Sequence, residues 1–359
     1  NASDDGSVEE TRARWPWVRV VVNARNDGFA PACNQGARMR GDASVIAFLN
    51  NDMRVDKGWL RELVQPLVRN ECAATTAKMF SWDGKNIDSA GGGMNFHGMG
   101  LQYGYKDVPH ERYDVPRKTL FACGGAMAIK GEVFDAIGGF DPEFFAYYED
   151  VDMGWRMWVE GHEIHYVPTA VCWHHHSGTS KRLPLETVRL IQVRNPLLAC
   201  FKNYDDENLR RVLPSALALA VRRMLIMSGL PIDKPFRIEH ARPSEGEASK
   251  GTLLERLAVK LGLRPPVRHG CVAVTAVSVA DLIAGNDLLS NWDHWMTRRA
   301  EVQSRRRRAD AEIFHLFLRP MWCIEDDPQF RALFTGSTKF FGVDALFDGH
   351  TLLDQDPAK

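Results

Sequence analysis

Residues 44–52 read SVIAFLNND, an apolar run that ends in two amides and a carboxylate. A short run of β-branched and apolar residues bounded by turn residues predicts a buried strand. Residues 18–23, which read VRVVVN, predict a second strand, and residues 30–40 between the two runs carry helix formers. A strand, a helix and a strand in this order are typical of an α/β fold.

The same pattern continues on the C-terminal side. We expect helices at 57–69, 131–137 and 149–160, strands at 73–80, 126–130 and 164–173, and a binding loop or small hairpins in the glycine-rich stretch 81–118. After Tyr204 the strand signals largely vanish, and helices are expected at 209–227, 252–261, 272–284 and 287–318, with a linker at 231–250. We therefore predict an α/β catalytic domain at 1–204 and an α-helical C-terminal region at 205–359.

Composition narrows the class of protein. The chain has 359 residues, 45% of them hydrophobic and 25% charged, which predicts a soluble globular protein of two structural units. A net charge of -1 argues against nucleic-acid binding, which favours a basic surplus. The seven scattered cysteines indicate reduced thiols, and we find neither a transmembrane run nor a signal peptide, so we predict a cytoplasmic location. The chain opens on a polar turn, which predicts a start in the middle of a fold.

Two strand ends carry candidate metal ligands. Asp52 follows the strand at 44–50, at the strand end where open α/β sheets place their ligands, and a carboxylate there suits Mg²⁺ or Mn²⁺ beside a diphosphate. His174 follows the strand at 164–173 and is a second candidate ligand. An Asx turn at Asp52 is an equally good interpretation, and His174 with the two histidines after it could form a solvated turn or bind metal only adventitiously.

A stretch of carboxylates among aromatic residues is the candidate catalytic edge. Residues 140–156 read FDPEFFAYYEDVDMGWR, and Glu149 and Asp150 stand at an expected helix start. A carboxylate there could take a proton from an acceptor hydroxyl, although acidic residues in a first helical turn are also ordinary partners of the helix dipole. Asp152 and Arg156 lie four residues apart and predict an ion pair within the helix.

Glycines before an expected strand are the last local signal. Gly124 and Gly125 would let the backbone approach a ligand closely, with a tight turn as the alternative. The chain has no G-x-G-x-x-G motif, no G-K-[ST] phosphate loop and no G-x-S-x-G elbow. Dehydrogenase, P-loop nucleotidase and serine hydrolase functions therefore lose their main support.

The order of these motifs resembles family 2 glycosyltransferases of the rhamnosyltransferase-like group over about the first 200 residues. The motifs that carry the resemblance are NASxDGS at 1–7, Asn34-x-Gly36, FLNND at 48–52, GGA at 124–126, GGFDPxFF at 138–145, YEDVD at 148–152, Val167-Pro168 and His174. The resemblance implies a GT-A fold, which is a Rossmann-like mixed sheet flanked by helices, a nucleotide-diphospho-sugar donor, a divalent metal (Mg²⁺ or Mn²⁺) and inversion at the anomeric carbon.

The resemblance also implies roles for single residues. It makes Asp150 the catalytic base, with Glu149 beside it binding acceptor or supporting the site. It makes Asp52 the metal and diphosphate ligand and His174 a further metal ligand. The residues that it assigns to binding the nucleotide-sugar are Asn1, Ser3, Asp5, Asn34, Gly36, Asn50, Asn51, Asp52, Gly124, Gly125 and Arg194. An ordinary helix surface is an equally good interpretation of Arg194.

Departures from the family pattern change what we expect of the nucleotide pocket and of the reaction. Asn50 stands where the family carries its first Asp, and the family's first strand and helix are absent, so the fragment is expected to lack part of its nucleotide pocket. The processive signature Q-x-x-R-W is also absent, which favours transfer of a single sugar. The expected partners are a dTDP- or UDP-linked donor and a glycan or lipid-linked saccharide acceptor. A non-catalytic GT-A module that binds nucleotide or glycan is the alternative, and a nucleotidyltransferase is a third interpretation.

One basic run bears on localisation. Residues 305–308 read RRRR, in an expected helix, and could touch anionic lipid at the inner face of the membrane. A solvated helix face is the favoured interpretation of this run.

Overall fold

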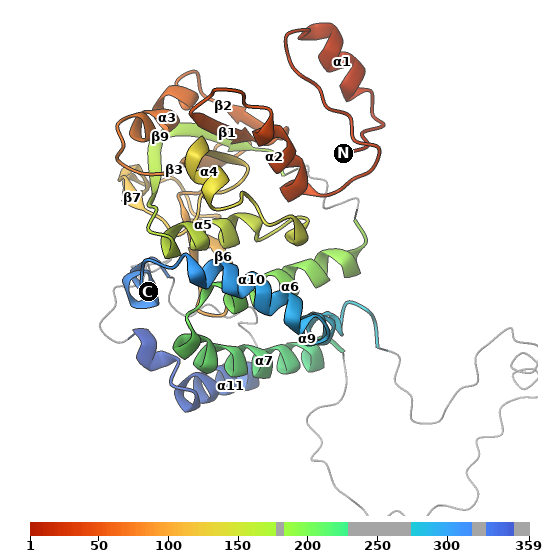
Figure 1. Cartoon of the computed structure of the whole chain (residues 1–359), viewed down its shortest axis with the longest axis vertical. Helices are drawn as coiled ribbons and strands as arrows, with labels where there is room; N and C mark the ends of the chain where they lie inside the picture. Colours follow the sequence, from red (N-terminus) through yellow and green to blue (C-terminus); the bar gives the residue numbers. More distant parts are fainter. Residues whose placement is uncertain (177–182, 229–273, 318–327, 348–359) are drawn as a thin grey trace, which may run out of the picture.

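The computed structural model describes residues 1–176, 183–228, 274–317 and 328–347. A mixed sheet with helices on both faces forms the N-terminal half, and a layer of helices packs beneath it (Figure 1). The strands are β1 Val45–Leu49, β2 Met53–Val55, β3 Ala74–Ser81, β4 Ile87–Ser89, β5 Gly92–Met94, β6 Gly100–Gln102, β7 Arg117–Lys118, β8 Ala126–Lys130 and β9 Ile164–His174. The helices of this half are α1 Ser7–Arg14, α2 Phe29–Arg38, α3 Trp59–Val68, α4 Gly131–Ala136 and α5 Glu149–Val159, with 3-10 turns at Glu111–Asp114 and Pro142–Phe144.

The main sheet has the strand order β1-β8-β3-β9-β2, with β4 beside β3 and β7 beside β9. The β3 and β9 strands are parallel, and the other pairs are antiparallel. The short strands β5 and β6 form a separate hairpin. The expected small hairpins in the stretch 81–118 are therefore confirmed.

Both faces of the sheet are covered, as the alternation of side chains along β8 shows. Ala126 and Ala128 pack into the cluster that holds α3, whereas Met127 and Ile129 pack into the large core that holds α5. Because successive residues of a strand point to opposite faces, a continuous apolar run is what a sheet covered on both sides requires. The expected α/β class is confirmed.

The expected strand at 18–23 does not form. Val18, Val21 and Val22 are exposed, and within the described residues this segment pairs with no strand. A β-branched run favours a strand only where a neighbouring strand and a core surface are available to it, and neither is present here. The α1 helix beside this segment buries none of its residues and stands apart from the body (Figure 1).

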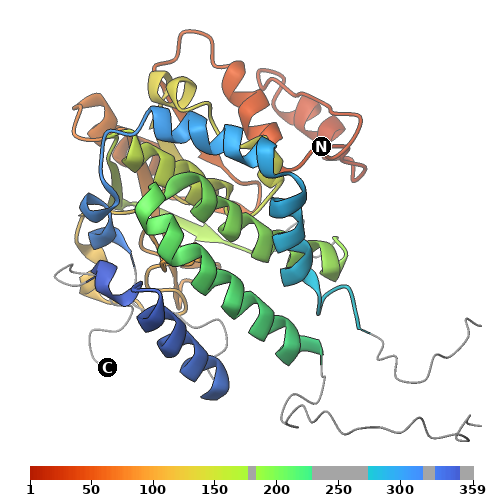
Figure 2. The same ribbon diagram turned by 60° about the horizontal axis from the view of Figure 1, so that its bottom comes forward.

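The helices that follow β9 pack as one layer (Figure 2). They are α6 Leu185–Asn203, α7 Asp206–Ser228, α9 Ala280–Ser290, α10 Trp292–Ser304 and α11 Pro328–Phe340, with short 3-10 turns at Asp310–Glu312, Phe314–Leu316 and Asp344–Phe347. The α6 helix begins before the expected boundary at Tyr204, and it contacts α5 as well as α7, α9 and α10. The expected linker at 231–250 and helix at 252–261 lie outside the described residues, and the expected helix at 287–318 is interrupted at Asn291 and ends at Ser304.

The basic run at 305–308 therefore lies after α10, and it contacts the N-terminal half. Arg305 donates a hydrogen bond to the carbonyl of Ala136, and Arg308 donates one to the carbonyl of Gly161. Arg306 pairs with Asp310 at 2.8 Å. The run therefore joins the C-terminal helices to the N-terminal half of the chain. Among the described residues, no helix combines the length and the apolar character needed to cross a membrane.

Candidate active site

A cleft of about 950 Å³ opens where the turn after β1, the turn before β8 and the start of α5 meet. The expected site residues that line it are Asn1, Ser3, Asp5, Asn50, Asn51, Asp52, Gly124, Gly125, Glu149 and Asp150. These residues come from four separate stretches of the sequence. The fold thus gathers the largest part of the expected site in one place.

Four expected site residues do not line the cleft: His174, which contacts Asp52, and three that lie elsewhere. The side chain of Asn34 donates to the carbonyl of Phe140 at 2.7 Å and accepts from its N–H at 3.0 Å, so it fixes the loop before α5. Gly36 lies on α2 with no atom within 4 Å of where a Cβ would stand. Arg194 does not line the cleft, and its Nε lies 2.7 Å from Asp287 of α9.

Asp150 faces the cleft and is held by backbone donors. The N–H of Gly124 donates to its Oδ2 at 3.1 Å, and the N–H of Val151 donates to its Oδ1 at 2.8 Å. Burial raises the pKa of Asp150, and the backbone hydrogen bonds oppose that shift. A half-buried carboxylate with a raised pKa beside a cleft is suited to accept a proton.

The two glycines before β8 allow this close packing. A Cβ on Gly124 would stand 3.1 Å from the ring of Phe29, and a Cβ on Gly125 would stand 2.7 Å from Met53. Asn50 donates its N–H to the carbonyl of Gly125 at 2.9 Å. The turn after β1 and the turn before β8 are therefore in direct contact at the floor of the cleft.

Glu149 stands beside Asp150 in a different environment. Its side chain is buried, and its Oε2 has no hydrogen-bond partner among the described residues. Burial and the charge of Asp150 raise the pKa of Glu149 well above its ordinary value. Its raised pKa therefore favours the neutral form of Glu149, and the residue lines the cleft beside Asp150.

The candidate metal ligands meet where β2 pairs with β9. Met53 is the register partner of His174, so the turn that ends in Asp52 lies against the end of β9. His174 Nε2 is 3.4 Å from Asp52 Oδ2. The expected neighbours were the strands at 44–50 and 164–173, but β8 and β3 separate β1 from β9, and β2 makes the contact.

A carboxylate that the sequence did not predict lies on the other side of His174. Asp88 Oδ2 is 2.8 Å from His174 Nδ1, and Asp88 Oδ1 is 2.7 Å from His176 Nε2. Asp88, His174 and His176 each offer a ligand atom within 4.8 Å of the others. Burial disfavours the charged form of His174, but the hydrogen bond and charge of Asp88, with those of Asp52, outweigh it and raise the pKa. His175 instead packs against Trp82.

This donor set fits a divalent cation. A metal-bound imidazole commonly donates its second ring N–H to a carboxylate, and Asp88 is placed to accept that hydrogen bond. Asp52 supplies the anionic oxygen on the other side of the ring. Sequence reasoning missed Asp88 because it stands alone in the irregular stretch 81–118, where no spacing marks it.

Residues 3–190 match the family model described as "Glycosyltransferase like family 2". The chain belongs to this family. The expected GT-A class of glycosyltransferase, a mixed α/β sheet followed by a mainly helical region, agrees with this membership and with the observed sheet.

Relatives of this family 2 chain include an O-antigen biosynthesis protein and two named glycosyltransferases. It is 29% identical over 190 residues to the O-antigen biosynthesis protein RfbC of Myxococcus xanthus, covering 50% of this chain and 15% of that protein. It is 27% identical to the N-acetylglucosaminyl-diphospho-decaprenol L-rhamnosyltransferase of Mycobacterium tuberculosis, covering 51% and 67%. It is 26% identical to N-acetylgalactosaminyltransferase 7 of Drosophila melanogaster, covering 45% and 29%. The chain thus spans less than a third of two of these relatives.

Two solved structures also resemble parts of this family 2 chain. GalNAc-T7 with UDP, GalNAc and Mn²⁺ aligns with a TM-score of 0.46 and 18% identity, covering 59% of this chain and 42% of that one. The mannosyltransferase PcManGT of Pyrobaculum calidifontis with GDP-Man and Mn²⁺ aligns with a TM-score of 0.40 and 16% identity, covering 81% and 76%.

Proposed function

We propose that this chain transfers a single sugar from a nucleotide-diphospho-sugar to a hydroxyl of a glycan or lipid-linked acceptor, with inversion at the anomeric carbon. The observation that carries the proposal is the convergence of Asp52 and Asp150 on one cleft in a family 2 chain. The names of two relatives, an O-antigen protein and a decaprenol-linked rhamnosyltransferase, favour a cell-surface polysaccharide acceptor.

In the proposed reaction Asp150 removes the proton of the acceptor hydroxyl. The resulting oxygen attacks the anomeric carbon from the face opposite the diphosphate, so the bond to the nucleotide breaks as the new glycosidic bond forms. Glu149, whose raised pKa favours its neutral form, lines the cleft beside Asp150 and is the proposed acceptor contact. Asn1, Ser3 and Asp5 line the same cleft and are the proposed nucleotide contacts.

Asp52 and His174 are the proposed ligands of Mg²⁺ or Mn²⁺, with Asp88 orienting the imidazole. When bound there, a divalent cation supplies charge neutralisation for the leaving diphosphate. Asp52 is the one carboxylate of the SVIAFLNND turn, because Asn50 and Asn51 are neutral. We therefore expect donor binding to depend strongly on Asp52.

The decisive experiment measures nucleoside diphosphate release from a panel of UDP- and dTDP-sugars, with Mn²⁺ and a polyprenyl-diphospho-saccharide acceptor. Release that depends on acceptor supports the proposal. Release of pyrophosphate from a nucleoside triphosphate would select a nucleotidyltransferase. Metal-dependent donor binding without turnover would select a non-catalytic module.

A further inference from the structure

The loop that leads into Asp150 has an unusual backbone. Phe145, Tyr147 and Tyr148 have φ angles of 60°, 64° and 66°. Side chains with a Cβ are disfavoured in this left-handed region, and aromatic residues have no local hydrogen bond to compensate for it. Three such residues among four successive positions need support from outside the loop. The loop ends at Tyr148, which caps α5 directly before Glu149 and Asp150.

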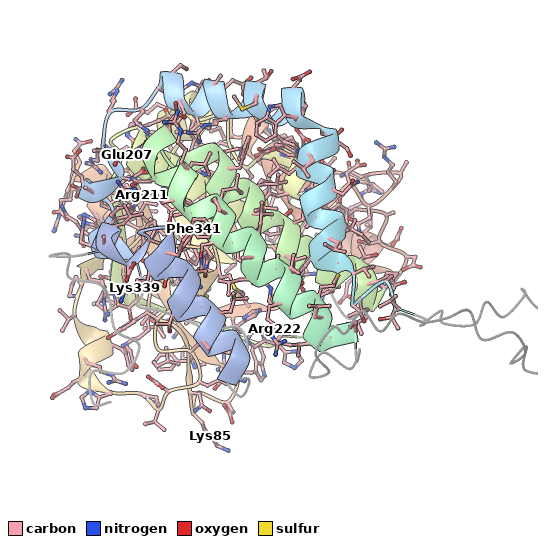
Figure 3. The ribbon with its side chains drawn as sticks, turned by 90° about the horizontal axis from the view of Figure 1, so that it is seen from below. Lys85, Glu207, Arg211, Arg222, Lys339 and Phe341 are labelled. Carbon is pink, nitrogen blue, oxygen red and sulfur yellow. The ribbon has the colours of Figure 1, made fainter. Side chains whose placement is uncertain are left out.

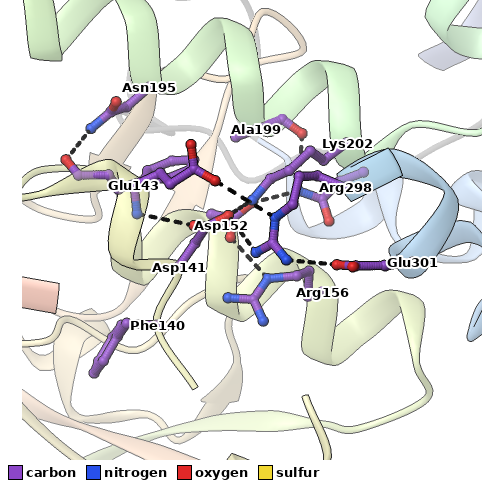
Figure 4. Close-up of polar contacts among 12 residues, drawn as sticks. Phe140, Asp141, Glu143, Asp152, Arg156, Asn195, Ala199, Lys202, Arg298 and Glu301 are labelled. Carbon is purple, nitrogen blue, oxygen red and sulfur yellow. Dashed lines mark hydrogen bonds and ion pairs between the residues drawn. The ribbon is translucent and has the colours of Figure 1, made fainter. Parts of the chain in front are cut away.

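The support comes from one side chain of α6. Asn195 is completely buried, and its Nδ2 donates to the carbonyl oxygens of Phe144 at 2.9 Å, Ala146 at 3.1 Å and Tyr147 at 2.7 Å. An amide nitrogen carries two hydrogens, so the three carbonyls share them and must converge on one point. Figure 4 shows Asn195 reaching from α6 toward this loop.

The opposite side of the loop rests on the start of α2. Ala30 donates its N–H to the carbonyl of Phe145 at 3.1 Å. A Cβ on Gly28 would stand 2.5 Å from the same carbonyl oxygen, so the two backbones approach as closely as glycine allows. The carbonyls of four consecutive residues therefore all have donors, three of them from Asn195.

On the basis of the proposed function, we propose that Asn195 is a positioning residue. It holds residues 144–148 as the wall of the cleft on the acceptor side, and it thereby fixes Asp150. Residues 145–148 line the cleft, whereas Asn195 does not, so Asn195 acts through the loop without touching substrate. Asn195 lies beyond the matched region, which ends at residue 190. The helical layer is then part of the catalytic site.

The adjacent arginine extends this connection to the C-terminal helices. Arg194 donates to the Asn195 Oδ1 at 3.2 Å and to the carbonyl of Glu143 at 3.1 Å, while its Nε contacts Asp287 of α9. Arg194 thus orients the side-chain carbonyl of Asn195, and Asp287 on α9 holds Arg194 in place. This arrangement leaves both hydrogens of the amide for the loop.

The test compares Asn195→Ala with Asn203→Ala in the 359-residue chain. Asn203 is a buried asparagine of the same helix, but its amide bonds to Asp152 and to the carbonyl of Ala199. We expect chymotrypsin to cleave after Phe145, Tyr147 or Tyr148 at least about 10-fold faster in Asn195→Ala than in the parent chain, at temperatures where both are folded. Asn203→Ala should show the parent rate at these sites.

The kinetic arm separates this role from general stability. Asn195→Ala should lose at least about 10-fold in kcat with acceptor while its affinity for UDP or dTDP with Mn²⁺ stays unchanged. If Asn195→Ala does not fold, Asn195→Ser, which keeps one donor, should show the same changes at a smaller magnitude. Parent-like cleavage, or faster cleavage with unchanged kcat, would overturn the inference. A parent chain without any transfer would overturn the proposed function instead, and the cleavage comparison would still decide whether Asn195 holds the loop.

Discussion

The Nδ1 atom of His174 lies 2.8 Å from the Oδ2 atom of Asp88. This contact fixes the imidazole ring so that Nε2 faces Asp52 across 3.4 Å. A carboxylate behind a ligating histidine orients the ring and makes it a stronger ligand. The two ring nitrogens of His174 thus have different partners: Nδ1 contacts Asp88, and Nε2 faces Asp52.

Replacing Asp88 by Asn should weaken Mn²⁺ binding about 10- to 100-fold, because the ring of His174 loses its charged partner. Isothermal titration with Mn²⁺ and UDP measures the affinity. Asp83→Asn, at an exposed turn of the same region, is the matched control and should leave it unchanged. Equal Mn²⁺ affinity in Asp88→Asn and the parent chain would contradict the role given to Asp88.

His176→Ala distinguishes two possible ligand sets. If Asp52 and His174 hold the cation, His176→Ala should change Mn²⁺ affinity less than about threefold, whereas Asp52→Asn should lower it at least about 10-fold. The reason is that the half-exposed His176 contacts Asp88, whereas Asp52 faces His174. The opposite ranking in the same titration would move the cation to the group formed by Asp88, His174 and His176.

The neighbouring carboxyls of α5 should respond differently to neutralisation. Asp150→Asn should lower kcat by about 10² to 10⁴, since the proposed base is lost. Glu149→Gln should cost less than about 10-fold, because burial and the charge of Asp150 raise the pKa of Glu149 and so favour the neutral form, which Gln resembles. Steady-state turnover of both variants, measured at about pH 7.5, checks this ranking. Equal losses would contradict the separate roles.

The pH dependence follows from the same two groups. Burial raises the pKa of Asp150 above its ordinary value of 3.8, so transfer should rise with pH through that raised pKa as the base form accumulates. The effect on stability has the opposite sign: the folded chain favours the neutral carboxyls, so their contribution is full below the unfolded pKa values and is lost as pH rises through the folded ones. A profile of kcat/KM against pH shows the first effect, and an acidic limb at the ordinary Asp value would contradict it.

Most of the sheet was predictable from the sequence, because the strands of the sheet are apolar runs that pair with neighbouring strands. The run at 18–23 has the same composition as such a strand, yet it stays exposed. Strand propensity reports how well a residue fits a half-buried pleated surface, and the residue types alone do not say whether that surface exists. Among the described residues no strand pairs with VRVVVN, and this, rather than its composition, decides the outcome.

The residues of the candidate site likewise differ in how far the sequence predicts them. Asp52 and Asp150 were predictable because each follows a local signal, a strand end or an aromatic helix start. Asp88 carries no local signal, since its partner His174 is 86 residues away. Asn195 belongs to an Arg-Asn step that resembles one in the family, which suggested a role near the diphosphate, but its bonds to a loop 49 residues away are not visible in the sequence. Arg194 was expected near the donor, and its contact with Asp287 depends on how α9 packs against α6. Long-range packing is what a single sequence leaves out.

A buried ion cluster beneath the acceptor-side loop gives the strongest stability prediction. Lys202 is almost completely buried, and its Nζ lies 2.6 Å from Asp141 and 2.9 Å from Asp152 (Figure 4). Burial by itself would raise the pKa of Asp141, but the adjacent Lys202 ammonium, with Arg298, holds it well below its ordinary value. Arg156 pairs with Asp152 at 2.8 Å, as its spacing predicted.

Removing this cation should destabilise the fold strongly. Lys202→Met keeps the apolar stem but leaves two buried carboxylates with fewer partners, which should cost about 3 kcal/mol or more of unfolding free energy. Arg211→Ala is the control, because Arg211 pairs with Glu207 on the exposed face of α7 (Figure 3) and such pairs contribute about 0 to 1 kcal/mol. Urea unfolding at neutral pH measures both, and a Lys202→Met loss no larger than that of Arg211→Ala would show that the cluster does not join α6 to the loop. The cost should shrink as pH falls through the depressed pKa of Asp141, since protonation removes the buried charge that Lys202 compensates.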